Sequence, residues 1–317
     1  MAVSNDISFT VTRDEIITEA LEQLGVLGEG DAPNSEQLTS SSRTLNMMTK
    51  AWQADGLNLF AVQTLYLFMQ EGVESFTLDA NTSNKFTASF VETTIMNAAL
   101  QGAFTVDVNS IEGILDGDQI GIAYGNSVQW TTVNGTPVGN TIIITDALVS
   151  DIEESAVVYA YTTTANRPMK IMEGYVHIGS SDTDIPIGHV SRTRYNRLSV
   201  KSSVGLPTQF YYDPQIAAGN LFVWPTAIDE KDYLVLFAQK TLSDMTSDSD
   251  NPEYPQEWYL PMALNLALLL APKYGTPNDA YSKIRMQAEK WYDAARGFDD
   301  ELYTSVYFTH DMRGEEL

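Results

Sequence analysis

The chain has 317 residues, of which 42 are acidic and 18 are basic, so its net charge is −24. Such a chain is not expected to bind nucleic acid through its overall field, because phosphate contacts need lysine and arginine. It contains no cysteine, which excludes disulfides, cysteine-ligated zinc and thiol catalysis. Two interpretations of the acidity stay open: solubility alone, and a surface that repels DNA.

Neither end of the sequence indicates a membrane or an export pathway. Residues 1–12 contain no basic segment and no apolar run, so no secretory signal is expected. The longest apolar stretch, residues 262–271, is too short to span a bilayer and is interrupted by Asn265. We expect a soluble protein that makes no membrane contact.

Two helices are predicted before residue 60. Thr12 and Glu15 have the spacing of a capping box, in which a hydroxyl and a carboxylate each accept a backbone N–H. Apolar residues then recur on one face as far as Leu24, and Gly25 is placed to end the helix in a left-handed conformation. The second helix is expected over residues 34–54, with an apolar stripe that includes Leu45 and Trp52.

In the middle of the chain, apolar and polar residues alternate with a period of two, which is typical of strands. Short strands separated by turns are expected between residues 64 and 239, and Asn134-Gly135 is a favourable hairpin turn. Residues 61–245 are therefore predicted to be β-rich. A smaller barrel-like module is expected within them at residues 85–165.

Two further helices are predicted near the other end. Pro255 begins the first, which is apolar on most sides and contains Trp258 and Leu266. The second runs from Thr276 to Arg296, and its inner face is predicted to contain Trp291.

Neither helical end could bury its apolar surface alone. We therefore predict an α+β fold in which both chain ends form a helical bundle, interrupted by a large antiparallel β-rich insertion. Residues 1–60 and 246–297 would form the helical domain, residues 61–245 the insertion domain, and residues 298–317 an extended C-terminal segment. The predicted helical core consists of large apolar residues from both ends: Leu21, Leu45, Trp52, Trp258, Leu266 and Trp291.

The C-terminal segment is rich in aromatic residues. A frayed terminus is one interpretation; the other, which the aromatic content favours, is an arm that docks on another subunit by adding to a sheet edge. The residues expected to dock are the large apolar ones: Phe298, Leu302, Tyr303, Val306, Tyr307 and Phe308.

The residues give little support for catalysis. The three histidines, His177, His189 and His310, lack metal-ligand spacing. A calcium loop beginning at Asp248 would place Pro252 at a ligand position and lacks the glycine of the sharp turn, which favours a solvated linker. We expect no enzyme activity, no metal and no cofactor.

Only one stretch is locally basic. Arg192, Arg194 and Arg197 surround Tyr195, an arrangement that could touch nucleic acid with the tyrosine stacking on a base. The alternative is an ion-pairing segment that meets acidic neighbours at a subunit interface. The net charge of −24 favours the interface.

Three stretches carry a family resemblance. Residues 13–26, residues 45–56 with their Trp52 and Asp55-Gly56 stop, and residues 254–275 resemble the first three helices of head-to-tail adaptor proteins of short-tailed bacteriophages. Residues 205–225 are similar to the β insertion of longer members. The module at 85–165 is absent from short members, so the resemblance implies no role for it.

The resemblance implies a structural protein of the virion neck, assembled in the host cytoplasm. Members form a ring, usually of twelve copies, in which the helical domain builds the ring and the C-terminal arm contacts the portal protein. The ring extends the DNA channel, retains packaged DNA and docks the tail tube or nozzle, with tail fibres as further partners. Double-stranded DNA would pass through without specific binding. The alternative is an outward-facing decoration or receptor-binding protein, and a hydrolase with dispersed carboxylates ranks last.

Overall fold

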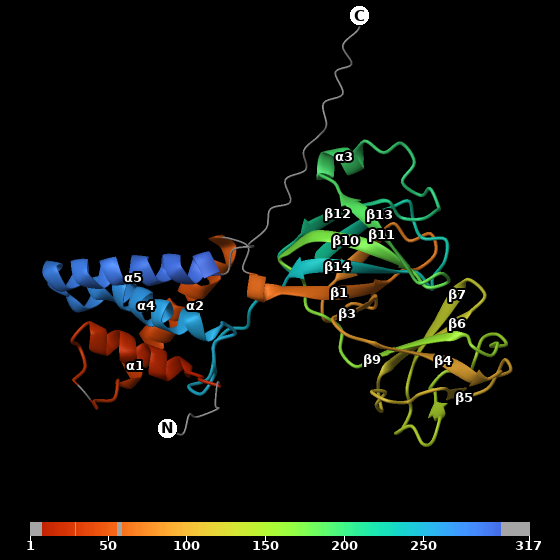
Figure 1. Ribbon diagram of the computed structural model, residues 1–317, viewed down its shortest axis with the longest axis horizontal. Coiled ribbons are helices and arrows are strands. Elements are labelled where there is room, and N and C mark those ends of the chain that lie inside the picture. Colours follow the sequence, from red (N-terminus) through yellow and green to blue (C-terminus); the bar gives the residue numbers. More distant parts are fainter. Residues whose placement is uncertain (1–7, 29, 56–58, 299–317) are drawn as a thin grey trace, which may run out of the picture. The chain divides into compact units, whose positions relative to one another are not determined.

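The computed structural model describes residues 8–28, 30–55 and 59–298 (Figure 1). These contain five α-helices and fourteen strands. The chain divides into two compact units: unit 1 comprises residues 1–61 and 242–317, and unit 2 comprises residues 62–241. None of the described helices combines the length and apolar character that crossing a membrane requires.

The predicted fold class is wrong. β structure dominates the described chain, in one sheet of eight strands and one of six, and the N-terminal helices lead directly into sheet. The helices are not paired into bundles at the two chain ends: α1 (Arg13–Gln23), α2 (Ser35–Asp55) and α5 (Asn278–Phe298) each pack against α4 (Tyr259–Tyr274). The reason is that α4 buries apolar residues on several sides and so acts as a centre rather than as one member of a pair.

The ends of α1 confirm two local predictions. The Thr12 hydroxyl accepts a hydrogen bond from the Glu15 N–H at 3.3 Å, and the Glu15 carboxylate accepts one from the Thr12 N–H at 2.8 Å. Gly25 has φ +70°, and its N–H donates to the Glu22 carbonyl. The Val26 N–H donates to the Leu21 carbonyl, which completes the pair of bonds that satisfies the last carbonyls of a helix.

The described residues of unit 1 share one apolar core. It contains side chains from all four of its helices and from the segment that precedes α4, among them Ile17, Leu21, Leu45, Met48, Leu242, Trp258, Met262, Leu266 and Ile284. Each fully buried side chain of this size contributes about 1.5–3 kcal/mol. Residues from both chain ends therefore stabilise one another.

The eight-stranded sheet lies in unit 2, in the order β2-β13-β12-β11-β10-β14-β1-β3. Its strands are β1 (Val62–Phe68), β2 (Ser75–Leu78), β3 (Lys85–Thr87), β10 (Lys170–Ile178), β11 (Thr183–His189), β12 (Gln209–Pro214), β13 (Gly219–Trp224) and β14 (Tyr233–Gln239). All neighbours are antiparallel except β11 and β12, which pair in parallel, so the predicted antiparallel arrangement does not hold for this pair. β14 lies between β10 and β1, and its continuous apolar run suits this interior position.

The six-stranded sheet is antiparallel, in the order β7-β6-β9-β4-β5-β8. Its strands are β4 (Val91–Asn97), β5 (Thr105–Val108), β6 (Gln119–Tyr124), β7 (Ser127–Thr132), β8 (Thr141–Ile143) and β9 (Val157–Tyr161). A bridge between Val133 and Ile144 joins its two edges, so the sheet curls towards a barrel around its own apolar core. Strands β4–β9 with their connecting loops are called the small module below.

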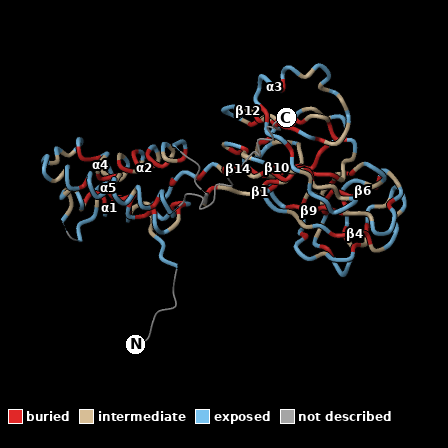
Figure 2. Tube along the Cα trace, turned by 45° about the horizontal axis from the view of Figure 1, so that its top comes forward, coloured by how far each residue is buried: buried red, intermediate tan, exposed pale blue. Residues whose placement is uncertain are grey.

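An aromatic layer joins the two sheets of unit 2. The Phe68 ring lies 4.9 Å from Tyr159 and 5.5 Å from Tyr233, and all three side chains are buried. The Tyr159 hydroxyl donates to the Lys231 carbonyl at 2.9 Å, and burial raises the pKa of Tyr159. Figure 2 shows buried residues running through the interior of both sheets. Unit 2 is therefore one body with two apolar cores and an aromatic seam.

Candidate interaction surfaces

The predicted helical core residues are placed as follows. Leu21, Leu45 and Leu266 are fully buried, and Trp258 is buried beside them. Trp52 is partly buried, with its ring 5.6 Å from Trp258. These five residues belong to one cluster.

Trp291 is the exception. It is 42% exposed, which corrects the prediction that it belongs to the core. α5 is covered by α4 on one side, where Ile284, Ala288 and Ala295 are buried, while Trp291 lies at the edge of that face. The Lys290 ammonium lies 5.2 Å from the centre of the Trp291 ring, a cation–π contact at the surface.

The predicted docking arm lies almost entirely outside the described residues. Leu302, Tyr303, Val306, Tyr307 and Phe308 belong to that part, and their role stays a prediction. Phe298 is the last residue of α5, and its side chain is 77% exposed. The described chain therefore ends on an unburied aromatic residue.

The described chain contains two sizeable cavities. One, of about 530 Å³, lies in unit 1 and is lined by residues 9–11, α1 and α4, including Glu15, Glu19 and Glu22. The other, of about 550 Å³, lies in unit 2 and is lined by parts of β6 and β9 and by loop residues that include Asp151 and Lys231. In the described part of the chain no group of three metal-ligating residues occurs.

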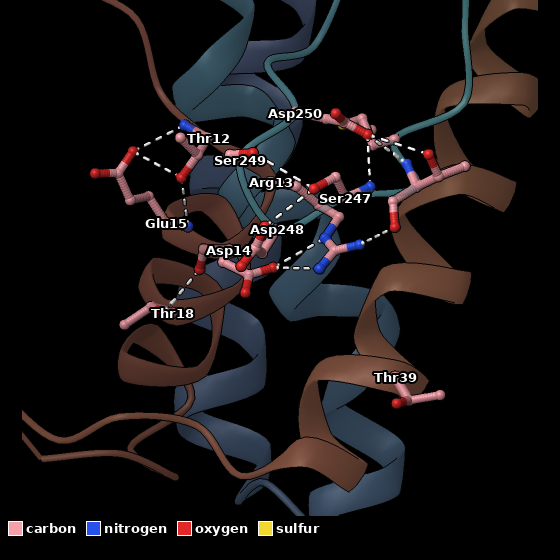
Figure 3. Close-up of polar contacts among 12 residues, drawn as sticks. Thr12, Arg13, Asp14, Glu15, Thr18, Thr39, Ser247, Asp248, Ser249 and Asp250 are labelled. Atoms are coloured by element: carbon pink, nitrogen blue, oxygen red, sulfur yellow. Dashed lines mark hydrogen bonds and ion pairs between the residues drawn. The ribbon is translucent and has the colours of Figure 1, made fainter.

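Residues 246–250, which precede α4 and contain Asp248 and Asp250, form a hydrogen-bonded turn (Figure 3). The Asp250 carboxylate accepts from the backbone N–H groups of Ser247 at 2.6 Å and Thr246 at 2.7 Å, and these bonds lower the pKa of Asp250. The Asp250 carbonyl accepts from the Arg13 N–H at 2.8 Å. The Arg13 guanidinium donates to the Thr246 carbonyl at 2.9 Å and pairs with Asp14 at 2.7 Å. These contacts attach the segment before α4 to the start of α1.

The histidines occupy separate places. On β10, the Nδ1 atom of His177 lies 2.8 Å from the Asp184 carboxylate. On β11, the His189 ring stacks on Phe210 with 5.0 Å between centres, and burial lowers the pKa of His189. His310 lies outside the described residues. The structure brings no two of the described histidines into one site.

The basic cluster forms a short helix, α3 (Arg192–Asn196), which follows β11. Ser191 caps it, since its hydroxyl accepts from the Arg194 N–H at 3.3 Å. Tyr195 is buried, with its ring 5.4 Å from Phe222 of β13. Arg192, Arg194 and Arg197 are all exposed. The sequence indicated the basic cluster but did not predict that it forms a helix. Ser191, a residue type that often caps helices, was the signal that could have revealed it.

Sequence reasoning missed an exposed apolar patch on the small module. Leu100 is 75% exposed, Phe104 55% and Val149 52%. All three lie in loops between predicted strands. Large apolar residues within turn segments were the signal that could have revealed them.

The comparisons with known proteins show only distant likeness. No protein-family model matches the chain, and no curated protein sequence matches it. Among solved structures, the chain is similar to the Gp54 tailspike of Acinetobacter baumannii bacteriophage AP22, determined with a capsular saccharide. The two are 17% identical, with a TM-score of 0.22, over 25% of this chain and 16% of the tailspike. A likeness this small shows neither a shared fold nor a shared function.

Proposed function

We propose that the chain is a structural virion protein that acts as a head-to-tail adaptor beneath the portal of a short-tailed bacteriophage. One observation carries the proposal. The three stretches that resemble adaptor helices, residues 13–26, 45–56 and 254–275, form α1, α2 and α4, and the described residues of these helices share one core. The described residues of these stretches, although distant in the sequence, belong to one compact unit.

The way the chain enters and leaves unit 2 supports this proposal. β1 and β14 are antiparallel neighbours, and Val62 at the start of β1 lies opposite Gln239 at the end of β14. The two connections of unit 2 are therefore side by side. A β unit attached in this manner can be enlarged or replaced without breaking the core of unit 1, which suits a part that presents a surface to the next component.

The charge supports a channel through which DNA slides. A ring of twelve copies with −24 each would carry roughly −290, a repulsive field for DNA wherever part of it faces the lumen. DNA would then pass without specific binding. A reconstruction that showed a basic lumen would contradict this part of the proposal.

The proposed partners are the portal protein, further copies of the chain, the tail tube or nozzle protein and tail fibres. The role needs no catalysis and no cofactor. The C-terminal residues 298–317 would dock on the portal, and unit 2 would face the tail components.

Binding to the portal ring of the same phage tests the proposal. The full chain is expected to form a closed ring on the portal, visible by negative-stain electron microscopy, with about twelve copies per portal by mass. Removing residues 298–317 should abolish binding while circular dichroism stays unchanged. Removing residues 1–7 is the matched control and should leave binding intact.

Two outcomes would contradict the proposal. If the shortened chain still binds the portal, the docking role of residues 298–317 is wrong. If the full chain forms no ring on the portal, and instead forms trimers or binds a host glycan, the receptor-binding alternative is correct.

A further inference from the structure

The arginines of α3 and of its C-terminal cap form no ion pair within the described residues, in a chain with a large acidic excess. Among the described residues Arg192, Arg194 and Arg197 make no ion pair, although acidic residues outnumber basic ones by 42 to 18. Arg194 and Arg197 are three residues apart, a spacing at which like charges repel on a helix by a few tenths of a kcal/mol. Arginine presents its donors in a planar fork that suits carboxylates.

This basic segment is held firmly to unit 2. Tyr195 is buried under it, and Lys201 lies over the Tyr195 ring at 5.5 Å. The Trp224 indole N–H donates to the Val200 carbonyl at 2.8 Å. Val200 and Val204, which follow the arginines in the sequence, are both exposed. We call Arg192, Arg194, Arg197, Val200 and Val204 the arginine surface.

A second surface has the complementary character. Two loops of the small module, residues 98–104 and 145–154, are joined by backbone hydrogen bonds: Ala99 with Ile152 in both directions, and Gly102 N–H to the Leu148 carbonyl at 2.8 Å. The Gln101 N–H also donates to the Asp151 carboxylate at 2.8 Å. These bonds fix the loops, so the exposed Leu100, Phe104 and Val149 are presented by an ordered backbone. We call these loops the acidic loop pair.

The same two loops also contain acidic residues. The exposed ones are Asp146, Asp151, Glu153 and Glu154. None of the four pairs with a cation in the described chain. Residues 81–166 hold nine acidic residues and a single basic one, Lys85, whose ammonium donates to Gln119 at 2.7 Å and lies over the Trp130 ring. The small module therefore has no cation of its own to offer these carboxylates.

The two surfaces cannot meet within one copy. α3 lies at one end of unit 2, and β4, which leads into the first loop of the pair, lies at the other end in both views (Figures 1 and 2). A contact between them must join two copies. We take the contact to be head-to-tail, a geometry that closes into a ring or extends into a filament, whereas a reciprocal two-fold contact would stop at a dimer.

We propose that the arginine surface of one copy docks on the acidic loop pair of a second copy. Exposed valines would meet Leu100, Phe104 and Val149 at the centre, and guanidinium–carboxylate pairs would surround them. Arginine and aromatic residues are the types that most often dominate binding energy at such contacts. A nucleic-acid partner is disfavoured by the net charge of −24. The inference uses unit 2 alone and does not depend on the adaptor role.

Disulfide trapping tests the contact directly, since the chain has no cysteine of its own. The double variant V149C/V200C carries one thiol in each surface. A disulfide needs Cα atoms about 4.4–6.8 Å apart, so it forms only where the surfaces meet. Mild oxidation of the full chain at high concentration and moderate ionic strength, where repulsion between copies is screened, is expected to give a ladder of covalent multimers. V149C/K170C, whose second thiol lies outside the arginine surface, is the matched control and should stay monomeric.

Charge reversal supplies the second arm. Adding R192E/R194E/R197E to the double-cysteine chain should reduce cross-linking at least tenfold, whereas R43E/K170E/K283E, which reverses three other exposed basic residues, should not. A chain with V200C and the reversed arginines, mixed with a chain carrying V149C and E153R/E154R, should recover the cross-link. The proposal is overturned if V149C/V200C gives no ladder of covalent multimers. It is also overturned if the ladder is unchanged when the three arginines are reversed. If reversing the arginines leaves cross-linking unchanged and instead abolishes binding of duplex DNA by the protein, the proposal is likewise overturned. Portal binding enters none of these measurements, so failure of the adaptor proposal would be seen separately.

Discussion

Leu266→Ala is the sharpest test of the core that the two chain ends share. Leu266 is fully buried in the middle of α4 and belongs to the cluster formed with α1, α2 and α5. The change removes three carbon atoms, which costs about 2.4 kcal/mol at ~0.8 kcal/mol for each buried group. The cavity left behind adds about 1 kcal/mol, because helices on several sides limit collapse. We expect unit 1 to lose about 3–4 kcal/mol.

Hydrogen exchange read by mass spectrometry locates the effect. Amides in α1, α2, α4 and α5 that exchange through unfolding of unit 1 should speed up together, by a factor on the order of 100, since each 1.4 kcal/mol is a factor of ten. Peptides from β4–β9 should exchange as in the unchanged protein, because the small module has a separate core. Leu269→Ala, at a site on α4 that is 49% exposed, is the control and should change the free energy of unfolding by less than about 1 kcal/mol. Unchanged protection of α1 and α2 in the Leu266 variant would refute a core shared by both chain ends.

Three further changes have defined outcomes. Thr12→Ala should destabilise α1 by about 1 kcal/mol in urea unfolding at pH 7. Hydrogen bonds from Thr12 lower the pKa of Glu15 in the folded protein. The stabilisation from the ionised Glu15 carboxylate is therefore complete above the usual carboxyl pKa and should be lost as pH falls through the lowered pKa of the folded state. Tyr195→Phe removes a buried hydroxyl that has no hydrogen-bond partner among the described residues and should leave Tm unchanged, whereas Tyr195→Ala should free α3 and speed tryptic cleavage at its arginines. Gly121→Ala would place a Cβ 2.8–2.9 Å from Trp130 ring atoms and should cost about 1–3 kcal/mol in thermal unfolding of the small module.

Local features of this fold could be read from the sequence because they depend on a few neighbouring residues. The Thr12–Glu15 capping box and the left-handed Gly25 each need only side chains within one turn. The burial of Leu21 and Leu45 follows from their helical spacing in the same way. The sequence also indicated the basic cluster of α3, since three arginines within six residues stand out in an acidic chain.

Features that depend on tertiary context were missed. The parallel pairing of β11 with β12 could not be predicted, because strands have the same side-chain period whichever way their neighbour runs. α3 is five residues long, too short to show a helical period, and its position depends on Tyr195 packing against another strand. The exposure of Trp291 depends on how many helices cover α5, and helical spacing says which face turns inward but not how much of it is covered.

The net charge of the chain and the proposed ion pairs between copies act over different distances, and the difference leads to a prediction about salt. Repulsion between whole copies of charge −24 is long-ranged and is screened beyond about 10 Å at 0.1 M salt. Ion pairs between the arginine surface and the acidic loop pair would act at contact and survive to higher salt. Cross-linking of V149C/V200C should therefore rise as salt increases from low values, pass through a maximum and then fall. Reversing the three arginines changes the net charge from −24 to −30, which strengthens the repulsion and removes the pairs, so the maximum should disappear. Cross-linking that only rises with salt would mean that apolar contact alone joins the copies, and that the arginines of α3 contribute nothing to their association.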